Sequence, residues 1–299
     1  MLAAETIDLL GSATRVLDCT LGGGGHSQAL LDAGVGSVIG VDRDPDALAA
    51  ATRRLESFAT AGRFSAIQSN YADVANNPAL NDLTFDGILL DLGISSHQVD
   101  AESRGFTFRP GAPLDMRMGP DAELSATDLL NDETEASLAA MFREFGDEHR
   151  ADRLAREIVR RRATQPFATS DDLVRAIRAV LGPRSGSADF ARLFQAVRIA
   201  VNDELPGLTR ALPVLRDRLT AGGTMVVIAY HSGEDRIVKN TFREWSAACI
   251  CPPKQPVCTC RGRPLGTTLT RRAVTASDEE TAANPRARSA RLRAWRSVE

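Results

Sequence analysis

Short apolar runs separated by helix-compatible segments dominate the first third of the chain. Such runs, flanked by glycine and aspartate, are typical of strands, and the most apolar one, at 85–93, is typical of a strand buried on both faces of a parallel sheet. An alanine-rich amphipathic segment at 45–58 predicts a crossover helix. The predicted strands lie at 15–19, 37–42, 64–71 and 85–93.

The alternation of strands and helices stops near residue 103. From there to residue 202 we find no convincing strand but several segments with helical periodicity. A block of this kind between two strands of a βα series is typical of a helical insert. The predicted helices lie at 127–131, 133–145, 149–162, 170–181 and 188–201.

The α/β rhythm resumes after residue 202, with a predicted helix, a buried strand and a second helix at 203–219, 221–230 and 234–247. Two segments of the tail, 269–274 and 290–298, are expected to pair as an antiparallel ribbon at the sheet edge. We therefore divide the chain into three parts. The first and last parts of one α/β domain lie at 1–102 and 203–299, and the helical insert lies at 103–202.

Four consecutive glycines, Gly22–Gly25, follow the first predicted strand and precede a helix-compatible run. Glycine lets the backbone approach a ligand with no Cβ in the way, and free N–H groups at the helix start face the ligand in nucleotide-binding folds. Asp42 ends the second strand about twenty residues later, where such folds place the acid that binds ribose hydroxyls. The structural alternatives are a flexible turn at the glycines and helix capping by the acids after strand two.

This combination favours a methyltransferase over a dehydrogenase. The dinucleotide fingerprint needs a third glycine where this chain has Ser27 or Gln28, depending on the frame. Five βα units, the acid after strand two and the terminal ribbon instead predict an α/β fold with the Rossmann-like sheet of class I S-adenosylmethionine-dependent methyltransferases, interrupted by an inserted all-helical domain.

Composition narrows the setting in which the protein acts. The 299 residues are 43% hydrophobic, and the net charge is −3. The N-terminus lacks the basic region of a signal peptide, and no apolar run approaches the ~18 residues of a membrane helix, so we expect a cytoplasmic protein with no membrane partner. The tail from Lys254 to Glu299 is different, since it has ten basic against four acidic side chains, and arginine suits phosphate.

Four of the five cysteines form the cluster Cys249, Cys251, Cys258 and Cys260. Four thiolates can hold zinc in a tetrahedron, but the Cys-x-Cys spacing differs from the commoner Cys-x2-Cys. We favour free thiols and assign no metal, and a structural zinc ion is the alternative. Cys19, inside the first strand, is predicted to be a core residue.

Several unusual motifs occur in one order along nearly the whole chain, and with them the sequence resembles the RsmH/MraW family of small-subunit ribosomal RNA methyltransferases. Two departures stand out: Gly233 where the family usually has leucine, and no histidine-containing segment before Leu2, which suggests a truncated start. The motifs are Gly23–Ser27, Asp91–Gln98, Arg104–Phe108, Pro113–Met118, Phe194–Ile199, His231–Lys239 and Asn284–Ser289.

The resemblance implies transfer of a methyl group from S-adenosyl-L-methionine to N4 of a cytidine in the decoding region of 16S ribosomal RNA, within an assembled small subunit. It also implies that the helical insert helps to recognise the substrate. Tyr71 stands where phenylalanine is expected and keeps an aromatic face for adenine. The implied cofactor contacts are Gly23, Gly24, Gly25, His26, Asp42, Tyr71, Asp91 and Gln98.

The cytosine amine is a poor nucleophile because its lone pair is delocalised into the ring, and it must lose a proton as the new bond forms. Asp91, at the carboxyl end of the fourth strand, is a candidate acceptor, but it could instead hold the methionine end of the cofactor. Asp115 and then His231 are the next candidates, and the identity of the base stays open.

A single reacting cytidine must be unpaired or extruded, so side chains that stack or bind phosphate are expected around it. Core packing is the alternative for at least one of the phenylalanines named here, and a surface pair with Asp115 is the alternative for Arg117. The candidate substrate contacts are Ser95, Ser96, Phe106, Phe108 and Arg117.

Three other functions remain as alternatives: a methyltransferase of another substrate, a nicotinamide oxidoreductase, and a non-catalytic ribosome-binding factor that uses the fold as a scaffold. The incomplete dinucleotide fingerprint argues against the oxidoreductase. The glycine loop, Asp42 and Asp91 argue against the scaffold, because a binding module has no need of a cofactor cleft. The sequence leaves a homodimer open.

Overall fold

A computed structural model describes residues 1–95, 98, 101–252, 255 and 257–298. The chain forms two compact units, one made of Met1–Gly93 with Leu205–Glu299, and the other of Ile94–Glu204. The range 103–202, expected as a helical insert, lies inside the second unit. Among the described residues, no helix has both the length and the apolar character that crossing a membrane requires.

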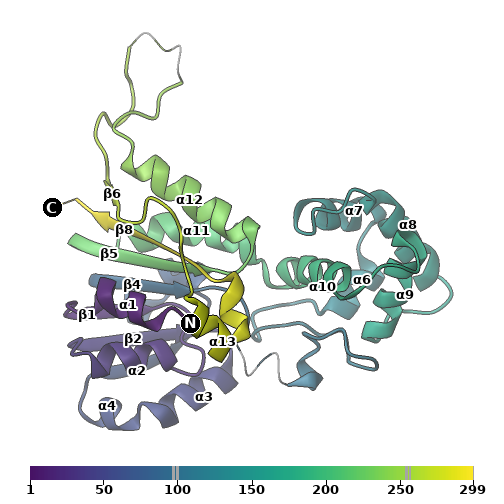
Figure 1. Cartoon of the computed structure of the whole chain (residues 1–299), viewed down its shortest axis with the longest axis horizontal. Coiled ribbons are helices and arrows are strands. Elements are labelled where there is room, and N and C mark those ends of the chain that lie inside the picture. The colour runs from purple at the N-terminus through teal and green to yellow at the C-terminus, as the bar shows by residue number, and fades with distance from the viewer. Residues whose placement is uncertain (96–97, 99–100, 253–254, 256, 299) are drawn as a thin grey trace. The chain divides into compact units, whose positions relative to one another are not determined.

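The first unit is built on one mixed sheet with the order β3-β2-β1-β4-β5-β8-β6, and β7 pairs with β8 (Figure 1). The strands from β3 to β5 are parallel, whereas β8 is antiparallel to β5, β6 and β7. The strands are β1 (Arg15–Asp18), β2 (Ser37–Asp42), β3 (Phe64–Gln68), β4 (Phe85–Asp91), β5 (Leu219–Ala229), β6 (Gly266–Thr268), β7 (Val274–Thr275) and β8 (Arg291–Ser297).

Successive side chains of the central strands enter two different cores, because a strand alternates its side chains between the faces of the sheet. Val16 packs on the face covered by α1 (Ala3–Leu10), α2 (Gly25–Asp32) and α3 (Pro45–Arg54). Leu17 packs on the other face, with α11 (Glu204–Arg216) and α12 (Ser232–Ser246). Since both faces are buried, β4 and β5 have the continuous apolar sequences of parallel strands.

The predicted helix at 45–58 is wrong in one respect, because the chain breaks it into α3 and α4 (Glu56–Thr60). At the break, Leu55 has φ −104° and ψ 16°, and its side chain is fully buried. The predicted third strand also ends early. The Asn70 side chain accepts the Ala72 N–H at 3.0 Å, and this cap starts the 3-10 helix η1 (Tyr71–Asn76).

The predicted antiparallel ribbon of 269–274 with 290–298 forms only in part. The Leu269 N–H donates to the Ala294 carbonyl at 2.9 Å, and Val274 pairs with Leu292 at the start of β7. Between them the segment is a connection, because the Thr270 hydroxyl accepts the Ala294 N–H at 2.9 Å in place of a backbone carbonyl. β8 is not at the edge of the sheet, since it lies between β5 and β6. The remaining short elements of this unit are η2 (Pro78–Leu80), α13 (Asp278–Ala283) and η4 (Pro285–Ser289).

The second unit is helical and has its own core. Phe142, Leu154, Ile177 and Leu193 are fully buried at its centre. They come from four different helices, and each lies on the apolar face that the sequence periodicity predicts. The elements are η3 (Glu102–Arg104), α6 (Ala126–Asp132), α7 (Glu135–Glu144), α8 (Ala151–Arg162), α9 (Ser170–Leu181) and α10 (Ser187–Asn202).

Candidate active site

The glycine loop connects β1 to α2 and needs glycine for two different reasons. Gly22 and Gly24 have φ of 50° and 77°, in the left-handed region that favours glycine. A Cβ on Gly24 would also lie 3.1 Å from Leu55 Cδ1 and 3.2 Å from Ala51 Cβ, so this glycine lets the loop pack against α3. Gly23 is exposed, and a Cβ there would meet no atom within 4 Å. Its open side is available to a ligand.

Asp42, at the end of β2, holds this loop in place. Its Oδ2 accepts the Gly22 N–H at 2.7 Å, and its Oδ1 accepts the Asp44 N–H at 2.9 Å. Burial raises the pKa of the Asp42 carboxyl above its usual value, while these two N–H donors lower it. The expected ribose contact of Asp42 stays a prediction. The neighbouring Asp44 has the capping role, since its side chain accepts the Asp46 N–H at 3.1 Å.

Asp91 is the centre of a polar group at the carboxyl ends of β1, β4 and β5. The Tyr230 hydroxyl donates to its Oδ1 at 2.6 Å, and His26 Nε2 lies 3.2 Å from its Oδ2. The orientation of the imidazole does not make the second contact a hydrogen bond, so the buried His26 Nε2 has no hydrogen-bond partner among the residues that the structure describes. The Asp91 N–H donates to Thr20 Oγ1 at 2.6 Å, which ties β4 to the segment after β1. Burial and the nearby Asp91 charge raise the pKa of the Tyr230 phenol.

Asp18 belongs to the same edge, and the sequence analysis assigned it no role. It is 1% exposed, and its carboxylate accepts the Ser27 hydroxyl at 2.7 Å and the Thr20 N–H at 3.2 Å. Burial raises its pKa from 3.8 to about 6, against the opposing effects of the Ser27 hydroxyl and of His26. A strand-ending acid just before the glycine loop was the sequence signal that could have identified it.

His231 has contacts that favour a capping role over proton transfer. It precedes α12, and its Nδ1 accepts the Gly233 N–H at 3.2 Å. Its Nε2 lies 3.1 Å from Oε1 of Glu234, a side chain that also accepts the Tyr230 N–H at 2.8 Å. A Cβ on Gly233 would lie 3.1 Å from the His231 ring, so glycine leaves room for this cap. A catalytic role for His231 stays a prediction.

Tyr71 begins η1, directly after β3, and packs half-buried against the core on the α11 and α12 face. Gln98 and Ser95 bond each other in the second unit: Gln98 Oε1 accepts the Ser95 N–H at 3.0 Å, and Ser95 Oγ accepts the Gln98 N–H at 3.2 Å. Their expected contacts with cofactor and substrate stay predictions. Ser96 lies outside the described residues.

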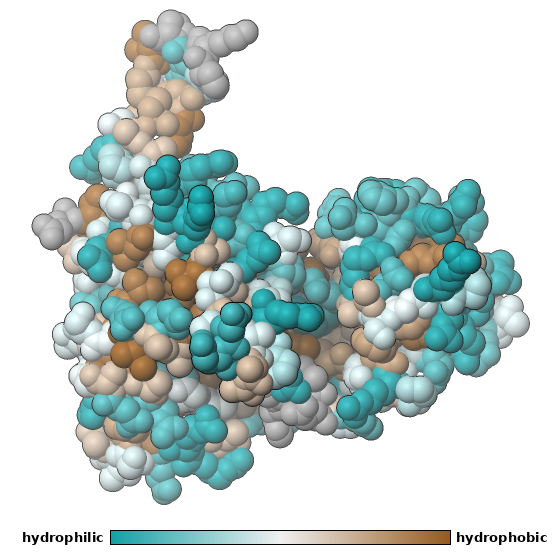
Figure 2. Space-filling model, viewed as in Figure 1, coloured by the Kyte–Doolittle hydropathy of each residue, from teal (hydrophilic) through white to brown (hydrophobic). Residues whose placement is uncertain are grey.

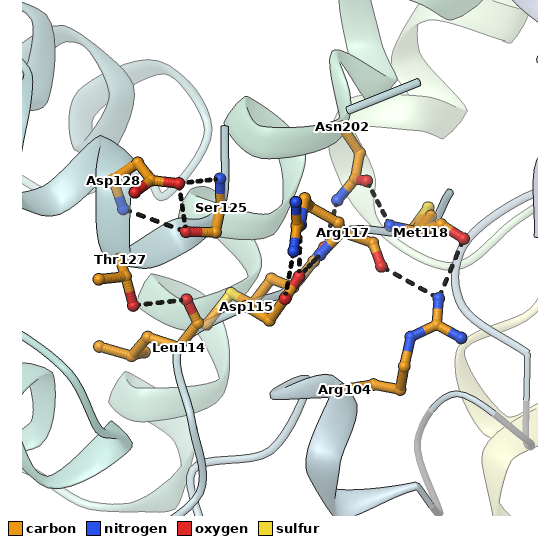
Figure 3. A network of polar contacts seen from close by, with 10 residues as sticks. Arg104, Leu114, Asp115, Arg117, Met118, Ser125, Thr127, Asp128 and Asn202 are labelled. Carbon is orange, nitrogen blue, oxygen red and sulfur yellow. Dashed lines mark hydrogen bonds and ion pairs between the residues drawn. The ribbon is translucent and has the colours of Figure 1, made fainter. Parts of the chain in front are cut away.

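Asp115 and Arg117 form a two-pronged ion pair in the second unit (Figure 3). Arg117 Nε and Nη2 donate to the two carboxylate oxygens at 2.9 and 2.8 Å, and the Arg117 N–H donates at 3.0 Å. The loop that holds the pair is fixed by buried Asn202, which contacts Met116 and Met118, and by Arg104, which donates to the carbonyl of Arg117. Hydrogen bonds from Arg117 hold the pKa of the Asp115 carboxyl below its usual value, so it is a weak proton acceptor.

The two phenylalanines expected to stack on substrate both contact protein. Phe108 packs edge-to-face on Phe190 and Phe194, with ring centroids 6.0 Å apart in each pair. Phe106 packs against the same helical core, and the Arg104 guanidinium lies 5.9 Å from its ring centroid. Since both side chains are half-buried, each keeps part of its surface in contact with solvent.

A basic pocket of about 440 Å³ opens beside the Asp91 group in the first unit. Tyr230 lines it and links it to Asp91. Two of its arginines share the buried Asp235: Arg293 Nε is 2.7 Å and Arg291 Nη1 is 3.7 Å from the carboxylate. The structure records no ion pair for the other cations within its described part. The cationic side chains of the pocket wall are Lys239, Arg271, Arg272, Arg288, Arg291 and Arg293.

A family model and named relatives match this chain over nearly its whole length. A family model described as the MraW methylase family matches residues 1–298. The ribosomal RNA small subunit methyltransferase H of Gemmatimonas aurantiaca is 65% identical over 298 residues, which are 100% of this chain and 94% of that protein. The protein of the same name from Heliobacterium modesticaldum is 50% identical over 285 residues, 93% of this chain and 90% of the relative. SMU.1697c from Streptococcus mutans, solved with SAH, is 10% identical with a TM-score of 0.46, over 100% of this chain and 98% of the other.

Proposed function

Since this chain belongs to the MraW methylase family, we propose that it transfers a methyl group from S-adenosyl-L-methionine to N4 of a cytidine in the decoding region of 16S ribosomal RNA. Methyl transfer from S-adenosylmethionine follows from the family, whose members are S-adenosylmethionine-dependent methyltransferases. The observation that carries the proposal is 65% identity over the whole chain with a protein named ribosomal RNA small subunit methyltransferase H.

The carboxyl edge of the sheet fits the methyl donor. Gly23 offers backbone with open space beside it, and His26 Nε2 is a buried polar atom that no described residue bonds. In the proposed complex, the glycine loop approaches the cofactor, Asp42 accepts from the ribose hydroxyls and the Tyr71 ring lies against adenine. Gln98 completes the proposed contacts. The bound cofactor supplies an electrophilic methyl group, and the protein has to align an amine with it.

Asp91 is the proposed anchor of the reacting end. Its carboxylate is oriented by the Tyr230 hydroxyl and faces the imidazole of His26, so it can hold a positively charged or N–H-bearing group at a fixed position. Two partners on one carboxylate restrict its rotation, which is what positioning requires. Whether this group bonds the methionine end or the cytosine amine decides whether Asp91 is a cofactor ligand or the base.

The two other candidate bases are less suited to remove the proton. Asp115 is engaged by the Arg117 guanidinium, and its pKa is lowered. His231 accepts a backbone N–H with one ring nitrogen and faces Glu234 with the other. We propose that Asp115 and Arg117, with Ser95, Ser96, Phe106 and Phe108, contact the RNA around the target cytidine.

The basic pocket supports RNA as the substrate, because a cluster of cations attracts phosphate, and four of the six have no ion pair within the described residues. It lies next to Tyr230 and therefore next to Asp91. A backbone phosphate held there would stay close to the reacting base. We further propose that the assembled small subunit, rather than free RNA, is the substrate.

Transfer of labelled methyl groups to small subunits that lack the modification tests this function. We expect label in 16S ribosomal RNA and recovery of N4-methylcytidine after digestion to nucleosides, with less transfer to naked RNA. Label in a different nucleoside would refute the cytidine assignment. Cofactor binding without transfer to either substrate would favour the non-catalytic ribosome-binding factor.

A further inference from the structure

The four clustered cysteines lie in the segment between α12 and β6, which Figure 1 draws as a loop extending beyond the end of α12. Much of its described surface is apolar (Figure 2). Ile250 and Val257 are 45% and 69% exposed, so neither is held in a hydrophobic core. The fold of this loop therefore needs another source of stability.

The sulfur atoms come together although none of the described residues between 248 and 262 is buried. Cys258 Sγ lies 3.8 Å from Cys249 Sγ, 3.8 Å from Cys251 Sγ and 3.4 Å from Cys260 Sγ, and Cys249 and Cys260 are 3.8 Å apart. All four sulfurs lie within 4.8 Å of one another. None of the four forms a disulfide.

These separations match a metal tetrahedron. Zinc–sulfur bonds of about 2.3 Å directed to the corners of a tetrahedron place the sulfurs about 3.8 Å apart. A disulfide would bring two sulfurs to about 2.05 Å and leave the other pair unexplained. We propose that Cys249, Cys251, Cys258 and Cys260 bind one zinc ion.

The surroundings of the cluster fit a structural site. The Ile250 N–H lies 3.4 Å from Cys260 Sγ, in the position of a backbone donor to a ligating thiolate. At the base of the loop, Arg261 donates to the carbonyls of Ala247 and Glu244, which joins the loop to the end of α12. Four thiolates fill the coordination shell and leave no open position for substrate, so the ion crosslinks the loop and takes no part in methyl transfer.

Metal analysis of the purified full-length protein, made without a histidine tag or chelator, tests this inference. We expect one zinc per chain by elemental analysis, and cobalt(II) should replace it with the visible absorption of a tetrahedral thiolate site. Titration with a mercurial reagent should release the zinc as four thiols react. The variants C258S and C249S should fall below about 0.1 zinc per chain. The matched control T259S, which changes a loop residue between two ligands, should keep the full amount.

Limited proteolysis gives a second readout that does not depend on methyl transfer. Removing the zinc should expose residues 247–262 to cleavage while the circular dichroism spectrum of the remaining chain is unchanged. Metal-free protein with four freely reactive thiols, two disulfides, or iron in place of zinc would each overturn the proposal. Zinc that C258S retains would do the same.

Discussion

At the scale of single residues, the carboxylates of the site differ in what surrounds them. Asp18 is buried with two neutral donors, and its pKa is raised to about 6. Asp115 is half-exposed and bonded to a guanidinium, and its pKa is lowered. A pKa raised by burial is common among carboxylates at functional sites. The two acids therefore differ in charge environment, and we predict that Asp18 acts on the cofactor side and the Asp115–Arg117 pair on the substrate side.

The substitution D18N should make the protein more stable at neutral pH and weaken cofactor binding. The folded-state pKa of Asp18 is above the unfolded value, so the folded chain binds the extra proton and stability falls as pH rises from about 4 to about 6. A shift of about two units corresponds to roughly 3 kcal/mol, as an order of magnitude. Denaturant unfolding from pH 4 to pH 8 should show this fall in the wild type and a flatter profile in D18N.

Cofactor titration of D18N then decides whether Asp18 contributes to cofactor binding. A D18N protein that is more stable above pH 6 but binds S-adenosylmethionine at least tenfold more weakly would place Asp18 in the cofactor site. Unchanged affinity would make Asp18 a structural acid only. S27A is the matched control, because it removes the hydroxyl donor and keeps the carboxylate.

The substitution D115N should lower turnover more than cofactor affinity. Asparagine keeps the size of the side chain but loses the charge that pairs with Arg117, so the arginine is released from its position. We expect a fall in kcat of about tenfold to a hundredfold with the cofactor Kd within twofold. Single-turnover transfer to small subunits and cofactor titration measure the two quantities. An unchanged rate would remove Asp115 from the mechanism.

At the scale of elements, β8 contributes side chains to the hydrophobic cores on both faces of the sheet. Trp295 and Arg293 share a face because they are two residues apart, and α12 covers that face. Trp295 packs on Trp245 of α12 with centroids 5.1 Å apart, and Arg293 pairs with Asp235 of the same helix. Leu292 and Ala294 enter the opposite core. The strand is therefore fixed by an aromatic contact and an ion pair on one side and by apolar packing on the other.

The substitution R293A should destabilise the protein by about 3 kcal/mol, because it removes the nearer of the two arginines that pair with the buried Asp235 in the described part of the chain. The control R143A breaks an exposed pair with Asp152 and should leave the unfolding midpoint unchanged. Denaturant unfolding of both variants at one pH makes the comparison. Equal losses of unfolding free energy in the two variants would show that the buried Asp235 pair stabilises the protein no more than the exposed Asp152 pair.

At the scale of the whole molecule, charge is distributed unevenly although the net charge is only −3. The sequence places its excess of arginine in the tail, and the fold gathers several of these residues around one pocket beside Tyr230. Several arginines elsewhere are neutralised by a carboxylate, as Arg143 is by Asp152 and Arg160 is by Glu157. A phosphate backbone would be attracted most strongly by the pocket cations for which the described part of the chain records no ion pair: Lys239, Arg271, Arg272 and Arg288.

The double substitution R271A/R272A should weaken RNA binding and leave cofactor affinity unchanged. We expect the slope of log K against log salt to fall by roughly 1 to 2, one contact for each arginine that meets a phosphate. The control R143A/R160A removes two arginines that carboxylates already neutralise and should change the slope much less. Binding to small subunits at several salt concentrations measures the effect. Equal slopes for the two double variants would contradict the proposed role of the pocket.

The sequence by itself determined the strands, the glycine loop and most helices, because these depend on periodicity and on residues close together in the chain. It did not reveal the break at Leu55 or the connection at Thr270, where one tertiary contact outweighs local preference. It named Asp91 and His26 separately. Only the tertiary structure decided that Tyr230, 139 residues from Asp91, bonds its carboxylate.

Burial and the joining of distant residues account for the rest. The raised pKa of Asp18 arises from its complete burial. Burial depends on which residues pack around the side chain, and the spacing of residues along the chain does not reveal this. The cysteine spacing left free thiols and zinc open, and the folded loop brings the four sulfurs to tetrahedral distances. The order of strands in the sheet decides which strand ends lie side by side. Packing over the whole unit, rather than any one segment, fixes this order.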